Sequence, residues 1–155
     1  MLRAVYSGRL KLFGEEDRAT LMAANNYAAT LNDVKRFEET RTLLRKVMPV
    51  ARRVLGESHE TTLRMRWLYA ETLYKDDGAT LDDLRKSVTT LEHVERIARR
   101  VLGGAHPLTA GLGREVLRAR SALRARETPP PGSAQETAVT RRPWRGRRLT
   151  KTKLT

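Results

Sequence analysis

Apolar side chains recur every three or four positions along most of the chain, which is the spacing of one face of an α-helix. In the first clear stretch these positions are Leu21, Ala24, Tyr27, Ala28 and Leu31. Faces with the same spacing run through residues 37–54, 63–73, 84–101 and 108–126. The pattern therefore predicts a succession of amphipathic helices and an all-α fold.

A short cassette containing glycine separates successive helices. It occurs three times, as Leu12-Phe13-Gly14-x-x-Asp17-x-x-Thr20, Val54-Leu55-Gly56-x-x-His59-x-x-Thr62 and Val101-Leu102-Gly103-x-x-His106-Pro107-x-Thr109. The glycines lie 42 and then 47 positions apart, and this period predicts an α-solenoid of stacked antiparallel hairpins. The glycine ends one helix in a left-handed conformation. Asp17, His59 and His106 are placed to cap the next.

Residues 1–127 are interpreted as one helical repeat domain. Its parts are the end of a preceding helix (1–13), repeats of about 14–55 and 56–102, and a partial repeat (103–127). This start suggests a chain cut from a longer array. The basic stretch Met1–Lys11 also fits an amphipathic targeting presequence. Residues 128–155, which open on three prolines, have few core-forming side chains and are expected to be a disordered basic tail.

Two local features modify this scheme. Asn32-Asp33 is expected to form the turn between the first two full helices. Pro49 lies inside the next helical stretch, where proline removes one backbone hydrogen bond at a cost of about 3 kcal/mol. A kink or a break is therefore expected near Val47-Met48.

The composition excludes several functions. Without cysteine, the chain has no disulfide, thiolate metal site or cysteine nucleophile. No apolar run approaches the roughly 20 residues needed to cross a bilayer, so we expect a cytoplasmic protein with no membrane partner. No paired acid and base, Ser/His/Asp spacing or phosphate-binding loop is evident. We therefore expect a non-enzyme without cofactor or metal, in which the histidines are structural.

The repeat resembles the tetratricopeptide repeat of the kinesin light chain type. The matching segments are Leu55-Gly56-x-x-His59-x-x-Thr62-Leu63, Leu102-Gly103-x-x-His106-Pro107-x-Thr109, Asn25-Asn26-Tyr27-Ala28 and Lys35-Arg36-Phe37-Glu38-Glu39. The family has Asn-Asn-Leu-Ala where this chain has Trp67-Leu68-Tyr69-Ala70, and it has Ala in place of Thr40. The resemblance covers about residues 1–126. It implies a scaffold that binds a peptide or a partner protein, and we infer no motor subunit from it.

Such repeats bind extended peptides on a concave surface lined by the first helix of each hairpin. The corresponding positions here are Met22, Asn25, Ala29, Arg64, Trp67, Glu71, Arg114 and Arg118. The resemblance implies that Asn25 holds the ligand backbone. The arginines beside an exposed Trp67 suit an acidic peptide with an apolar anchor. The alternative is that Trp67 is buried between helices and the arginines are a solvated surface.

The net charge of +13 favours acidic partners. In the tail, arginines interleave with a tryptophan, which suits phosphate binding and base stacking or a nuclear address. These residues are Arg141, Arg142, Trp144, Arg145, Arg147 and Arg148. A solvated basic tail is the alternative to such a nucleic-acid-binding site. The ends of the solenoid are also expected to leave apolar residues open for self-association: Leu2, Val5, Val116, Leu117 and Leu123.

Overall fold

The computed structural model describes residues 1–128 and 131. In this part the chain forms six α-helices and no strand: α1 (Leu2–Phe13), α2 (Arg18–Asp33), α3 (Phe37–Val54), α4 (Glu60–Lys75), α5 (Leu81–Leu102) and α6 (Pro107–Glu127). Apart from residues 128 and 131, the predicted disordered tail lies outside the described residues, and so do Arg141, Arg142, Trp144, Arg145, Arg147 and Arg148.

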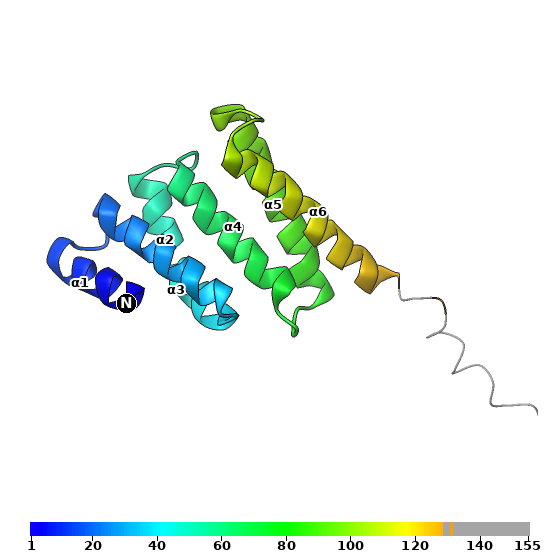
Figure 1. Ribbon diagram of the computed structural model, residues 1–155, viewed down its shortest axis with the longest axis horizontal. Helices are drawn as coiled ribbons and strands as arrows, with labels where there is room; N and C mark the ends of the chain where they lie inside the picture. Colours follow the sequence, from blue (N-terminus) through cyan, green and yellow to red (C-terminus); the bar gives the residue numbers. More distant parts are fainter. Residues whose placement is uncertain (129–130, 132–155) are drawn as a thin grey trace, which may run out of the picture.

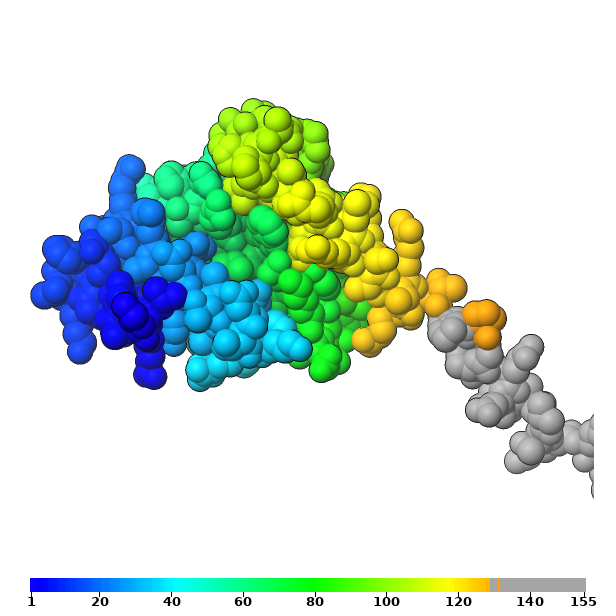
Figure 2. All heavy atoms as spheres, viewed as in Figure 1, coloured from blue at the N-terminus to red at the C-terminus, as the bar shows by residue number. Residues whose placement is uncertain are grey.

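The helices stack in two layers along the long axis of the molecule (Figure 1). Each helix packs on the next one in the sequence, and in the inner layer α2 also contacts α4 and α4 contacts α6. In the outer layer α1, α3 and α5 do not contact one another. The helices of the outer layer are thus farther apart than those of the inner layer, so the stack curves toward the inner layer. The inner layer therefore lines the concave face. The predicted all-α solenoid is confirmed. In Figure 2 the colours follow the sequence from one end of the molecule to the other, so the helices are stacked in chain order.

Each predicted cap forms. The Asp17 carboxylate accepts a hydrogen bond from the Thr20 backbone N–H at 2.8 Å, which satisfies a free donor at the start of α2. The Nδ1 atoms of His59 and His106 accept from the backbone N–H groups of Thr61 and Leu108, the second residues of α4 and α6, each at 3.1 Å. Both histidines therefore have the structural role predicted for them.

Two apolar clusters form the core, and α4 contributes to both. Leu21, Ala24, Ala28 and Leu31 of the predicted α2 face are at most 4% exposed. Met65 of α4 joins the cluster of α1, α2 and α3, whereas Leu63 and Ala70 join the cluster of α5 and α6. The core is therefore continuous through α4, as expected of hairpins that bury their apolar faces against neighbours.

The turn after α2 lies later than predicted. The helix continues through Asn32 and Asp33, and the chain turns at residues 34–36. Asn32 is buried and its side chain bonds to Glu71 of α4, so the amide makes a contact between helices instead of a local turn. Lys35 has a φ of +63°, a left-handed conformation in which a Cβ is unfavourable. Glycine occupies this place in the motif that Lys35–Glu39 resembles.

The break predicted near Val47-Met48 is absent, because α3 runs without interruption from Phe37 to Val54, whereas the alternative, a kink, stays a prediction. Pro49 lies on the exposed side of the helix, where water can satisfy the carbonyl that its missing N–H leaves free. Buried Val47 and Val50 hold the backbone on the other side.

The open ends of the solenoid expose fewer apolar residues than expected. Leu2 and Val5 are 37% and 46% exposed. On α6, Val116 is only 7% exposed and Leu123 packs on the second core cluster, which corrects their prediction as open residues. Leu117 is 65% exposed. Self-association through these ends stays a prediction.

Lys35→Gly is expected to raise the free energy of unfolding by about 0.5–1 kcal/mol, because glycine adopts a positive φ without a steric penalty. Lys35→Ala is the control, since it removes the charge and keeps the Cβ. Urea denaturation of both variants measures the effect. An equal gain for the alanine variant would show that charge, not backbone conformation, is responsible.

Candidate functional site

The concave face contains a hollow of about 340 Å³ between α2 and α4. It is lined by Met22, Asn25, Asn26, His59, Glu60, Thr61 and Arg64. Met22 is 54% exposed and supplies apolar surface. The hollow thus brings together two of the predicted groove residues, Asn25 and Arg64, at the border of two repeats.

Asn25 and Thr61 are the two buried polar residues that line this hollow, and in the described part of the chain Asn25 has an unpaired side-chain atom. It is 9% exposed, and its Oδ1 has no hydrogen-bond partner among the described residues. A buried acceptor without a donor costs about 1–3 kcal/mol. The binding role predicted for Asn25 stays a prediction.

The three predicted arginines differ in their surroundings. Arg64 donates through Nε and Nη2 to Glu60 Oε1, at 3.2 and 2.7 Å, and its side chain is 48% exposed. Arg118 donates through Nη1 to Glu115 at 3.1 Å and is 65% exposed. Arg114 is exposed and has no carboxylate partner within residues 1–128 and 131. Each arginine keeps donors free for a ligand.

The contacts of Trp67 contradict the predicted exposed indole and favour packing between helices, whereas the groove role of the arginines stays a prediction. The ring is half-buried, packs on the second core cluster and donates through Nε1 to Glu71 at 2.9 Å. It lies so close to Gly111 of α6 that a Cβ there would be 2.7 Å from Trp67 Cη2. Trp67 is therefore a spacer between α4 and α6.

Glu71 and Glu115 form the centre of a polar network that joins all three inner helices. Asn32 Nδ2 of α2 donates to Glu71 at 2.6 Å. The Lys75 ammonium lies 3.2 Å from Glu71 and 3.6 Å from Glu115. The Tyr74 hydroxyl donates to Glu115. We call these residues, with Trp67 and Arg118, the carboxyl network.

The two buried carboxyls are perturbed in opposite directions. Burial and the nearby Glu115 raise the pKa of Glu71. Burial alone would raise the pKa of Glu115, but the hydrogen bond from Tyr74 and the charge of Lys75 outweigh it, so the pKa of Glu115 is lowered. Burial and the bond to Glu115 raise the pKa of the Tyr74 hydroxyl. Glu71 is therefore the member of the pair that holds a proton more readily.

Sequence analysis missed Asn32, Tyr74, Lys75 and Glu115 as members of this network. Glu115 carried a signal, because it falls within the apolar spacing of Leu112, Val116 and Ala119. A charged residue at such a position predicts a buried partner. The sequence does not reveal which residue that partner is.

The described residues contain no group of three or more side chains suited to hold a metal ion. Within the same part of the chain, no helix has the length and apolar character to cross a bilayer. The predicted nucleic-acid residues of the tail lie outside this part, so that alternative stays a prediction.

Gly111→Ala is expected to lower the free energy of unfolding by about 1–3 kcal/mol, because the new methyl group would overlap the Trp67 ring. Gly113→Ala is the matched control. No atom lies within 4 Å of its added Cβ, so it should gain up to about 1 kcal/mol from helix propensity. Thermal and urea unfolding report both changes. Equal effects would contradict a tight contact between α4 and α6.

The free energy of unfolding of the Glu71→Gln variant is expected to rise relative to that of wild type as the pH rises from about 5 to about 8. The raised pKa means that folding retains a proton on Glu71. The resulting stabilisation is complete below the ordinary value of 4.5 and is lost as the pH rises through the raised value. Glutamine cannot lose this proton. Urea denaturation across the pH range measures the difference.

Glu115→Gln should behave in the opposite way. Its lowered pKa means that the ionised group contributes stability above the ordinary value of 4.5, which is lost as the pH falls through the lowered value. The variant should therefore lose about 1–3 kcal/mol at neutral pH, as expected for a buried charged acceptor. The same pH dependence for both variants would refute the conclusion that Glu71 holds a proton more readily than Glu115.

Comparison with known families matches residues 19–78 to the tetratricopeptide repeat model. The match spans nearly all of α2, all of α3 and α4, and ends in the turn before α5. A comparison with curated proteins found no match. Repeats of this kind generally mediate protein–protein interaction and typically form non-catalytic scaffolds. The family match and the stacked hairpins identify residues 19–78 as a tetratricopeptide repeat segment of an α-solenoid.

Proposed function

We propose that the chain is a non-catalytic scaffold that binds an acidic peptide or a partner protein with an acidic segment on its concave face. The observation that carries this proposal is the hollow between α2 and α4, where Asn25, Arg64 and Met22 meet. It offers a hydrogen-bonding amide, a guanidinium and apolar surface in one place. Those are the groups needed to hold a peptide backbone, a carboxylate and an apolar side chain.

Two arginines give the face its preference for acidic ligands. Arg64 and Arg118 already contact Glu60 and Glu115, but each guanidinium has five donors and both side chains are about half exposed or more. Arg118 uses only Nη1, so its other donors can take a ligand carboxylate. An arginine fork holds a carboxylate with two parallel hydrogen bonds.

In this proposal Trp67 and Glu71 shape the floor of the groove. Trp67 spaces α4 from α6, and its bond to Glu71 links it to the carboxyl network. The apolar anchor of the ligand then meets Met22, which is 54% exposed. Arg114 of α6, the third predicted arginine, does not line this hollow; it lines the groove between α5 and α6.

We further propose that these repeats are of the kinesin light chain type. The caps by His59 and His106 support it, because the cassette that resembles this type places histidine at these positions. Thr40 and the Trp67–Ala70 segment depart from the same pattern.

Selection of a displayed random peptide library against the chain tests the proposal. Peptides with acidic residues beside an apolar residue should be enriched. Their affinity, measured by fluorescence anisotropy, should fall at least about tenfold in the Arg64→Glu and Arg118→Glu double variant, because each removed contact is charge-assisted. Circular dichroism should show unchanged helicity.

The matched control is the Arg45→Glu and Arg100→Glu double variant, which has the same net charge. Both residues are exposed on helices of the outer layer, so this variant should bind the selected peptides nearly as well as wild type. An equal loss of affinity in both double variants would show that net charge, not the concave face, is responsible. Enrichment of peptides without acidic residues would refute the proposed ligand class.

A further inference from the structure

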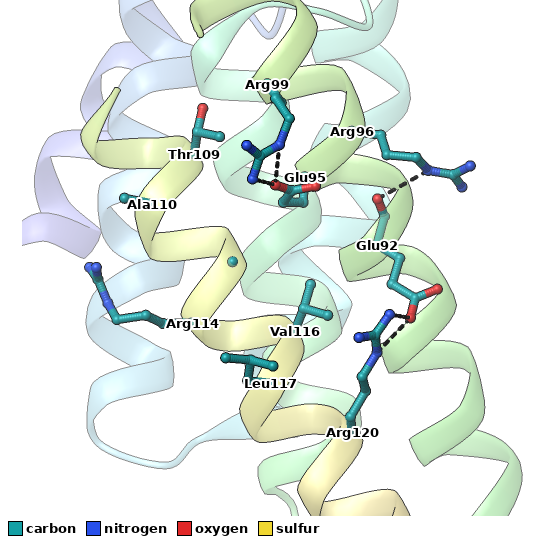
Figure 3. A pocket seen from close by; sticks show the side chains of 11 residues that line it. Glu92, Glu95, Arg96, Arg99, Thr109, Ala110, Arg114, Val116, Leu117 and Arg120 are labelled. Atoms are coloured by element: carbon teal, nitrogen blue, oxygen red, sulfur yellow. Dashed lines mark hydrogen bonds and ion pairs between the residues drawn. The ribbon is translucent and has the colours of Figure 1, made fainter. Parts of the chain in front are cut away.

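A second surface lies at the end of the solenoid, outside the concave hollow. It is a groove of about 700 Å³ between α5 and α6, which we call the end groove. Figure 3 shows it with the side chains of Glu92, Glu95, Arg96, Arg99, Thr109, Ala110, Arg114, Val116, Leu117 and Arg120. Leu117, a large apolar residue that lines it, is 65% exposed.

The repeat indicates what kind of element fits this groove. Ala110 and Leu117 follow Gly103 by the same number of residues as Leu63 and Ala70 follow Gly56. Leu63 and Ala70 are fully buried and pack in one cluster with α5, the second helix of their hairpin. On α6 the same two positions are exposed. The end groove is therefore the surface that a second helix would cover in a complete hairpin.

The charges of the groove indicate the chemistry of that helix. The Nε atoms of Arg99 and Arg120 lie 2.8 Å from Glu95 and Glu92, respectively, so both carboxylates are occupied. Arg96 bonds only to a backbone carbonyl, and Arg114 has no carboxylate partner in the described part of the chain. Figure 3 shows Arg114 pointing away from the paired groups. The groove thus has an excess of positive charge beside an apolar surface.

Segments of this chain that could occupy the groove have the wrong charge. The helix α1 carries Arg3, Arg9 and Lys11 and no acidic residue. Residues 128–155 carry seven arginines and lysines and one glutamate. Like charges brought together at an interface oppose binding. Neither a second copy that offers α1 nor the tail therefore complements Arg96 and Arg114.

We propose that the end groove binds an acidic amphipathic helix of another protein, which takes the place of the second helix of the third hairpin. The apolar side of this helix covers Ala110 and Leu117. Glutamates or aspartates on its flanks pair with Arg96 and Arg114. This mode of binding lays an apolar helix face into a groove, and it uses a surface separate from the concave hollow.

The test uses the full chain and a labelled synthetic helix with leucines on one side and glutamates on its flanks. Fluorescence anisotropy should show binding that weakens with salt. Affinity should fall at least about tenfold with Leu117→Asp and with Arg96→Glu, each measured separately. Both residues are exposed, so the variants should fold, and circular dichroism verifies this. A peptide with lysine in place of each glutamate should not bind.

Two controls separate this surface from others. Arg100→Glu changes an exposed arginine of α5 that does not line the groove, so binding should persist. The Arg64→Glu and Arg118→Glu double variant alters only the concave face and should also retain binding. Loss in that double variant but not with Leu117→Asp or Arg96→Glu would overturn the end-groove proposal. Self-association of the chain that Leu117→Asp abolishes would also overturn it, in favour of a second copy.

Discussion

The contact between the Trp67 ring and Gly111 determines how closely α4 and α6 approach each other. The Trp67 ring lies so close to the α6 backbone that it leaves no room for a Cβ at position 111, and Gly111 meets this requirement. The Trp67 ring then donates to Glu71, which also accepts from Asn32 of α2. The same residue, Trp67, thus sets the spacing of the inner helices and takes part in the carboxyl network. The form of the concave face depends on it, because α2, α4 and α6 line that face.

Ion pairs determine where the positive charge of the chain stays exposed. Near the buried Glu71 and Glu115, Lys75 compensates carboxyl charge, while Arg118 combines a bond to Glu115 with an exposed guanidinium. At the end groove, ion pairs occupy Glu92 and Glu95, and the excess positive charge stays at the surface. These two surfaces are the ones that we propose for acidic partners. The proposed ligand of the concave hollow is an extended segment, and that of the end groove is a helix.

Features with a local cause could be predicted from the sequence. The helices, their caps and the solenoid follow from apolar spacing and from the repeated cassette, and the positions of Asp17, His59 and His106 confirm it. Contacts between distant residues could not be predicted in the same way. Asn32 was assigned to a turn because asparagine favours turns, but a partner 39 positions away holds it inside α2. Trp67 fits either an exposed or a packed position by spacing alone, and only Gly111 of α6 decides between them.

The central claim is that the inner layer forms the binding surface of this repeat segment. Amide hydrogen exchange of the full chain, with and without a saturating acidic peptide from the library selection, tests it most directly. The account predicts slower exchange in α2, α4 and α6 upon binding, strongest where the hollow joins α2 to the start of α4. Protection confined to α1, α3 and α5, with none in the inner layer, would contradict it.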